Sequence, residues 1–249
     1  MTIWFASGNS HKKAELAAIL NAQGDVQEGR DLPRSTRSFT EKEKNITTPC
    51  TPWFNILIPS DAGLDFDPEE TGTTFYENAL LKARELYSLL EKSRHGVNPP
   101  PFKPGDPIIA DDSGICVDAL GGRPGIYSAR YAGANGENAP NAQQLESTQR
   151  NRLLLEELDG VHLRTARFVC AMALLFSPDR FYVAQETFEG EIVSGMDAAK
   201  GGGGFGYDPI LFIPDLGRTV AELSDDEKNT ISHRAKAGKI IANLLRNYA

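Results

Sequence analysis

The sequence predicts an α/β fold with a mixed central β-sheet flanked by helices. Apolar, strand-like segments alternate along the chain with segments of helical periodicity. In addition, residues 177–180 (Ser-Pro-Asp-Arg) form a good hairpin turn between the apolar segments 168–176 and 181–188. Strands separated by helices favour parallel pairing, whereas a hairpin is antiparallel, so the sheet should contain both.

The N-terminal part should form one strand and one helix, followed by an irregular insertion. Thr2–Ala6 has the apolar character of a buried strand, and residues 11–22 carry apolar residues at helical spacing. Prolines and a charge run then interrupt the pattern, and one short strand is expected near residues 54–58. We therefore predict a single domain over residues 1–249, with an irregular insertion around 30–68.

The clearest helix is predicted at residues 74–90, because it carries an apolar stripe and Thr74 with Glu77 fits a capping box. The strand Ile108–Ala110 follows, and it ends in residues 111–114 (Asp-Asp-Ser-Gly). Further helices are expected at 141–158, after a second capping box at Ser224 and Glu227, and at 232–247.

The composition is that of an ordinary globular protein, with 40% hydrophobic and 24% charged residues. A formal net charge of −8 argues against a broad electrostatic grip on nucleic acid or an anionic membrane. The longest apolar run is about half of what a membrane-spanning helix requires, and the N-terminus indicates a strand and not a signal peptide. Cys50, Cys116 and Cys170 show no CxxC spacing, so we expect free thiols in a reducing cytoplasm.

The turn at residues 7–13, between the first strand and the first helix, is the first candidate site. Unpaired amides at a helix N-terminus attract phosphate, and Lys12 in the first turn adds a positive charge. Alternatively, Gly8 and Asn9 only make the turn and Lys12 is solvated.

Two adjacent carboxylates, Asp111 and Asp112, form the second candidate site. They cannot both be buried without a partner, because desolvating each charge costs several kcal/mol. A cation should lie near at least one of them, and we favour Mg²⁺ because the pair follows a strand where α/β sheets place ligand crevices. The alternative is a polar turn in which Asp111 is exposed or caps backbone amides.

Three more acidic residues, Glu69, Glu70 and Glu77, precede or begin the helix at 74–90. We expect Glu77 to serve its capping box rather than to bind metal. Glu70 has less structural reason for its place and is the better candidate for a metal contact, directly or through water.

A glycine-rich segment at residues 201–206 forms the fourth candidate site. Five glycines in six positions suit a backbone that approaches a ligand or bends sharply, although a flexible linker is the alternative. On an extended chain Phe205 and Tyr207 would point the same way, so that one ring could stack on a base.

The fifth candidate is a set of cations near the C-terminus. Lys228 lies in the short capped helix, and Ser232 is the expected N-cap of the last helix. His233 and Arg234 then occupy the first turn, where the helix dipole disfavours positive charge. This misfit favours a ligand-facing role, with a surface His-Arg pair as the alternative.

Taken in order, these segments resemble the inosine triphosphate pyrophosphatase family. Five blocks carry the resemblance: SGNSHKKAEL at Ser7–Leu16, TFYENALLKA at Thr74–Ala83, ADDSGICVDALGGRPGIYSARYAG at Ala110–Gly133, GGFGYDPILF at Gly203–Phe212 and TVAELSDDEKNTISHRAKA at Thr219–Ala237. They span nearly the whole chain, and five ordered blocks are far more specific than one glycine-rich loop.

The resemblance implies a two-lobed α/β fold with a long mixed sheet, a ligand cleft between the lobes, and a homodimer. It implies Mg²⁺-dependent hydrolysis of deaminated purine nucleoside triphosphates, namely ITP, dITP and XTP, to the monophosphate and pyrophosphate. The alternatives are a pyrophosphatase for other modified nucleotides and a non-catalytic nucleotide-binding protein.

The resemblance also assigns roles to particular residues. Asp112 would be the catalytic base and a metal ligand, Glu70 the second metal contact, with Asp111 and Glu77 less secure. The phosphates would be cradled by Ser7, Gly8, Asn9, Ser10, His11 and Lys12, with Ser113 beside the substrate. The nucleoside would be bound by Phe205, Gly206, Tyr207, Asp208, Lys228, His233 and Arg234. The insertion around 30–68 looks longer than the family pattern needs, which blurs the alignment of Glu70.

Overall fold

The computed structural model of this chain describes residues 1–22, 54–96, 98–133, 145–201 and 206–248. Its strands are β1 (Thr2–Phe5), β2 (Asn55–Leu57), β3 (Ile108–Val117), β4 (Thr165–Ser177), β5 (Arg180–Ile192), β6 (Leu211–Ile213) and β7 (Arg218–Thr219). Its α-helices are α1 (Ser10–Asn21), α2 (Phe75–Ser93), α3 (Ser147–Glu157), α4 (Asp225–Ile231) and α5 (His233–Tyr248).

The strands form one seven-stranded sheet in the order β2-β1-β3-β4-β5-β6-β7. β1 pairs in parallel with β2 and β3, and all later neighbours pair antiparallel. The sheet is therefore mixed, and the predicted α/β class is confirmed, as is the hairpin between β4 and β5.

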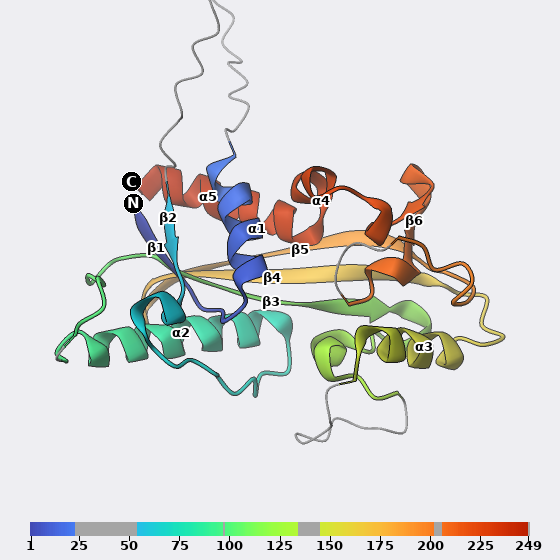
Figure 1. Cartoon of the computed structure of the whole chain (residues 1–249), viewed down its shortest axis with the longest axis horizontal. Helices are drawn as coiled ribbons and strands as arrows, with labels where there is room; N and C mark the ends of the chain where they lie inside the picture. The colour runs from blue at the N-terminus through green and yellow to red at the C-terminus, as the bar shows by residue number, and fades with distance from the viewer. Residues whose placement is uncertain (23–53, 97, 134–144, 202–205, 249) are drawn as a thin grey trace, which may run out of the picture.

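Helices cover both faces of the sheet, with α1 and α5 on one face and α2 on the other (Figure 1). The apolar core is divided accordingly. One cluster joins α1 and α5 to the sheet, and a second joins α2 to the opposite face. A third cluster lies toward the other end of the long strands, with α3 and β6. The single domain and the ligand cleft between two lobes stay predictions.

One strand differs from its prediction in a way that matters for the site. β3 does not end at Ala110 but continues to Val117, so Asp111 and Asp112 lie within the strand, opposite Met172 and Ala171 of β4. The alternative of a polar turn at residues 111–114 is wrong, because both carboxylates find cationic partners from the covering helices and can stay in the ladder.

Gly114 shows how closely another segment approaches this strand. A Cβ there would lie 2.3 Å from the carbonyl oxygen of Gly125 and 2.5 Å from Ser128 Oγ, so only glycine fits.

Most other expected elements are present within a few residues of their predicted limits. The short strand near 54–58 is β2, and the helix expected at 141–158 is α3, although residues 141–144 lie outside the described part of the chain. Residues 30–53 of the predicted insertion also lie outside the described part of the chain. β6 and β7 were not predicted, because two or three residues are too few to show a period.

Cys116 and Cys170 are free thiols as expected, and Cys50 lies outside the described residues. None of the helices in the described part of the chain combines the length and apolar character that a membrane span requires.

Candidate active site

The two adjacent carboxylates lie on opposite faces of the sheet. Successive side chains of a strand alternate between faces. Ile109 belongs to the cluster of α1 and α5, whereas Ala110 belongs to the cluster of α2. Asp111 accordingly meets residues of α1 and α5, and Asp112 meets residues of α2. Two neighbouring residues of one strand thus serve two different environments.

Asp111 is buried and held by two cations. Lys12 Nζ lies 3.2 Å from each carboxylate oxygen, and Arg234 reaches Oδ2 through Nε at 3.2 Å and Nη2 at 3.0 Å. Burial alone would raise the pKa of Asp111, but Lys12, Arg234 and Lys82 outweigh it and hold that pKa well below its usual range. Asp111 is therefore favoured as an anion at neutral pH.

The negative charge of Asp112, on the α2 face, is balanced less completely than that of Asp111. Its Oδ2 accepts a hydrogen bond from Asn78 Nδ2 at 3.1 Å, and its Oδ1 lies 3.4 Å from Lys82 Nζ. Burial raises the pKa of Asp112, and Lys82 lowers it without cancelling that rise, because Glu70 and Asp111 add repulsion. The raised pKa makes Asp112 a better proton acceptor than an exposed aspartate, which suits a general base.

Glu70 shares Lys82 with Asp112. Its Oε1 lies 2.9 Å from Lys82 Nζ, and its Oε2 lies 3.2 Å from an Arg130 nitrogen. Burial would raise the pKa of Glu70, but Lys82 and Arg130 outweigh it and lower that pKa. The structure therefore brings together the two predicted metal ligands, Asp112 and Glu70, around one lysine.

These two carboxylates fit the way proteins hold Mg²⁺. That ion is usually bound through one or two carboxylates, with water and substrate phosphates completing its octahedron. Within the described residues, no three His, Cys, Asp or Glu side chains form a ready-made cage. Glu77 is engaged elsewhere, since its carboxylate accepts hydrogen bonds from the backbone and hydroxyl of Thr73. The donor set therefore suits a metal that arrives with its substrate.

The predicted phosphate turn is organised by Asn9, which caps α1. Asn9 Oδ1 accepts hydrogen bonds from the amides of His11 at 2.9 Å and Lys12 at 3.2 Å, and Ser7 Oγ accepts one from the amide of Asn9 at 3.1 Å. Gly8 and Ser10 are exposed beside it. Because Asn9 occupies two of the helix-end amides, a phosphate would have to share or replace this cap.

The segment around Tyr207 is not extended, so that prediction was wrong. Gly206 has a φ of +67°, and a 3₁₀ turn begins at Asp208. The chain bends there and buries Tyr207, whose hydroxyl donates a hydrogen bond to the carbonyl of Ser128 at 2.9 Å. The Tyr207 ring is a core residue and is not free to stack on a base. Phe205 lies outside the described residues.

The other predicted nucleoside contacts fall into two groups. Lys228 Nζ lies 2.8 Å from Asp208 Oδ2, which joins α4 to the turn after Gly206. The His233 ring stacks on Phe168, with centroids 5.0 Å apart, and its Nδ1 is enclosed without a hydrogen-bond partner among the described residues. Burial, aided by Arg234, lowers the pKa of His233 well below its ordinary value, so the imidazole is neutral.

Arg234 belongs with Asp111 and not with His233. Besides Asp111, it contacts Glu15 of α1 at 2.8 Å, and its Nη2 lies 3.4 Å from Ser113 Oγ. These two carboxylates explain why a cation occupies the first turn of α5 despite the helix dipole.

Sequence reasoning missed two residues of α2 that face the site. Asn78 and Lys82 are buried, and they are four residues apart, so they share one face of the helix. Polar residues within the apolar stripe of a helix are the signal that would have found them.

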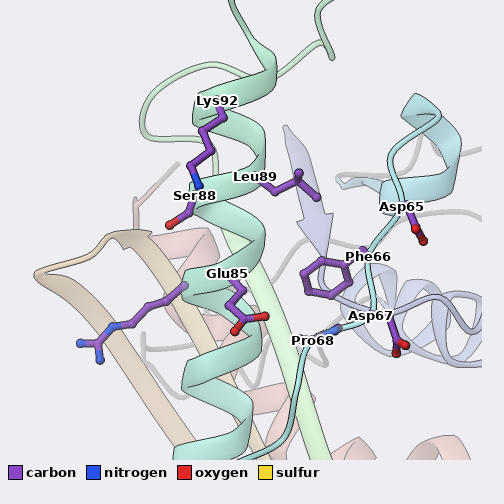
Figure 2. Close-up of a pocket in the computed structure, with 9 residues that line it drawn as sticks. Asp65, Phe66, Asp67, Pro68, Glu85, Ser88, Leu89 and Lys92 are labelled. Atoms are coloured by element: carbon purple, nitrogen blue, oxygen red, sulfur yellow. The ribbon is translucent and has the colours of Figure 1, made fainter.

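Two surface hollows lie near α2, but neither is lined by Asp111 or Asp112. One, of about 410 Å³, lies between the C-terminal half of α2 and residues 65–68, where Figure 2 shows Phe66 beside Leu89. The other, of about 490 Å³, lies between the start of α2 and residues 121–127. Neither hollow therefore tests the predicted ligand cleft between two lobes.

Comparisons with known proteins show the family to which the chain belongs. Residues 3–244 match the Ham1 family. The chain is 40% identical to a dITP/XTP pyrophosphatase of Treponema denticola over 99% of both chains, and 43% identical to one of Salmonella typhimurium over 97% of this chain and 96% of the relative. The Staphylococcus aureus Ham1 protein has a similar structure, with a TM-score of 0.70, 32% identity and full coverage of both chains. This chain belongs to the Ham1 family.

Proposed function

We propose that this protein hydrolyses deaminated purine nucleoside triphosphates, namely ITP, dITP and XTP, to the monophosphate and pyrophosphate. The observation that carries the proposal is the environment of Asp112, a buried carboxylate with a raised pKa beside Lys82 and Glu70. Relatives named dITP/XTP pyrophosphatase align with almost the whole chain, which supports the same reaction here.

Asp112 acts as the general base in this proposal. It accepts a proton from a water molecule, which attacks the α-phosphorus in line with the leaving pyrophosphate. Asn78 and Lys82 hold the two carboxylate oxygens and so orient the base. A positioned base of this kind contributes about 10²–10⁴-fold in rate.

Cations on the two faces of β3 neutralise the phosphates in this proposal. Lys12 lies at the start of α1 and is about one-third exposed, so its ammonium is open to a ligand while it contacts Asp111. Mg²⁺, held by Asp112 and Glu70, would stabilise negative charge on the phosphate oxygens when bound. Lys82 lies between these two carboxylates, and its ammonium holds them together when no Mg²⁺ is bound.

Selection of the base would come from hydrogen-bond donors directed at the 6-oxo group. Adenine carries an amino group at that position, so buried donors would be left unpaired, and such a mismatch discriminates by orders of magnitude. Lys228, whose ammonium is held by Asp208, is the described candidate for such a donor.

A nucleotide panel tests the proposal. The protein is incubated with ITP, dITP, XTP, ATP and GTP in the presence of Mg²⁺, and the products are separated and identified. We expect monophosphate and pyrophosphate from the first three, and little from ATP and GTP. Release of orthophosphate, or equal turnover of all five, would contradict it. A protein that binds these nucleotides without turnover would instead be the non-catalytic alternative.

We also propose that the protein is a homodimer, supported by an apolar patch beside α2. Phe181 and Val183 on β5 are 39% and 38% exposed, although their neighbours Leu175 and Ala173 on β4 are buried under α2. Tyr76 of α2 is 46% exposed as well. A second copy placed on this patch would cover it.

Sedimentation of Val183→Lys tests this assembly. We expect the wild type to sediment as a dimer and the variant as a monomer with an unchanged melting temperature. Met196→Lys is the matched control, because Met196 is 39% exposed outside the patch. A monomeric wild type, or a dimeric Val183→Lys, would contradict the assignment.

A cytoplasmic location and the absence of a nucleic-acid partner belong to the same proposal. They are supported by the free thiols of Cys116 and Cys170 and by the net charge of −8.

A further inference from the structure

The carboxylate of Asp111 is held by three side chains of this chain. Lys12 makes two contacts with it, Arg234 makes two, and Ser113 Oγ donates one hydrogen bond at 3.3 Å. Four of these contacts fall on Oδ2, and Oδ1 accepts one from Lys12. The Asp111 side chain is also only 1% exposed. Asp111 therefore acts on other protein groups, and not on a ligand of its own.

The two cations come from helices that are distant in sequence. Lys12 belongs to α1, Arg234 belongs to α5, and Asp111 lies between them in the sheet. Both are long side chains that lose much conformational freedom when they are fixed. Their common contact with Asp111 sets the positions of the ammonium and the guanidinium relative to each other.

Glu15 differs from Asp111 although it contacts the same guanidinium. It contacts Arg234 Nη1 at 2.8 Å and its side chain is 23% exposed, whereas Asp111 contacts both cations from a buried position. Glu15 balances charge near the surface, and Asp111 is the group that can fix the geometry.

We propose that Asp111 is a positioning residue that holds Lys12 and Arg234 in register, and so couples the phosphate-binding part of the site to the nucleoside-binding part. The inference rests on the proposed function, and on the nucleoside-binding role that the family resemblance assigns to Arg234. Loss of Asp111 should then weaken both halves of a nucleotide at once, because both cations lose their common anchor.

Binding of two probes that are not hydrolysed tests this coupling. Inorganic tripolyphosphate reports on Lys12 and inosine reports on Arg234, each titrated calorimetrically without metal. We expect Asp111→Asn to weaken the binding of tripolyphosphate at least tenfold and the binding of inosine at least threefold. Asp61→Asn is the matched control, because it removes the carboxylate partner of the neighbouring Lys13, 2.5 Å away, and should change neither affinity more than twofold.

A charge-conserving variant covers the case in which Asp111→Asn does not fold. Asp111→Glu keeps the counter-charge but displaces the carboxylate by one methylene, so we expect a melting temperature close to that of the wild type and at least a threefold loss for each probe. A folded Asp111→Glu or Asp111→Asn that binds both probes within twofold of the wild type would overturn the inference. So would a loss confined to one probe, or a wild type that binds neither.

A double-mutant cycle separates positioning from general damage. If Asp111 acts through Lys12, the fold-losses in kcat/KM for ITP in Asp111→Glu and Lys12→Met should combine to less than their product. Combination with Arg130→Met, whose guanidinium contacts Glu70, should give the full product. Equal behaviour of the two cycles would contradict a positioning role.

The same measurements distinguish this inference from the proposed function. A wild type that binds both probes in an Asp111-dependent way but hydrolyses none of the nucleotides leaves the coupling intact and refutes the pyrophosphatase. A wild type that hydrolyses ITP while its Asp111 variants bind normally refutes only the coupling.

Discussion

The two faces of β3 treat neighbouring carboxylates in opposite ways. On the α1 and α5 face, Asp111 is over-compensated by Lys12 and Arg234, and its pKa is lowered. On the α2 face, Asp112 is left with one lysine that it shares with Glu70, and its pKa is raised. The first face is built as a fixed charge network, whereas the second keeps a carboxylate that is ready to take a proton or a cation.

Asp112→Asn should break the catalytic face with the largest effect. Asparagine keeps the shape but cannot accept the proton, so we expect kcat for ITP to fall about 10³-fold or more, within the range for loss of a general base. Because the folded state disfavours the Asp112 anion, the variant should be at least as stable as the wild type at pH 8. Steady-state kinetics and thermal melting measure the two effects. A stable variant with normal turnover would remove Asp112 from catalysis.

Asp111→Asn should damage stability instead. It leaves Lys12 and Arg234 without their buried partner, and breaking a buried ion pair from one side costs about 3–5 kcal/mol. Urea unfolding of the metal-free protein measures this loss. Asp61→Asn, which removes a more exposed lysine partner, should cost less than about 1 kcal/mol. Equal costs for the two variants would show that Asp111 is not a structural anion.

How much of this contrast could be predicted from the sequence depends on the element. The strand of Asp111 and Asp112 and the helix that begins at Thr74 follow from apolar patterns and a cap, and the family resemblance picks out Asp112 and Glu70. The length of β3 cannot be predicted in this way, because the sequence Asp-Asp-Ser-Gly is typical of turns. The cationic partners of Asp111 lie 99 and 123 residues away in sequence. The two carboxylates can be placed on opposite faces of the sheet only when β3 is known to continue past them.

Burial of Tyr207 could not be predicted for a similar reason. Its alternation with Phe205 indicates an extended chain, but Gly206 takes a left-handed φ that turns the backbone toward the core. Glycine permits both conformations at little cost, so its presence does not choose between them. Contacts between distant segments, here with Ser128, decide the outcome.

The two faces should also respond to pH with opposite signs. Asp111 has a lowered folded pKa, so its stabilisation is present above the unfolded pKa of about 3.9 and is lost as the pH falls below it. Asp112 has a raised folded pKa, so its contribution is present at low pH and is lost as the pH rises through that pKa. In unfolding of the metal-free protein, the loss of stability caused by Asp111→Asn should therefore become smaller below about pH 4. The advantage of Asp112→Asn should grow from pH 4 to pH 7. Parallel pH profiles for the two variants would contradict the comparison.

Lys12→Ala should give the smallest effect and should sharpen the comparison on the α1 and α5 face. Arg234 remains on Asp111 in this variant, so the buried anion keeps one partner and the fold is retained. Loss of one charge-assisted contact should weaken ITP binding by about tenfold, equivalent to about 1.4 kcal/mol, while inosine binding changes little. Lys13→Ala is the matched control, because Lys13 follows in the same helix turn but contacts Asp61 instead. Equal losses for ITP and inosine would place Lys12 away from the phosphates, and equal losses in the two lysine variants would reduce its role to general surface charge.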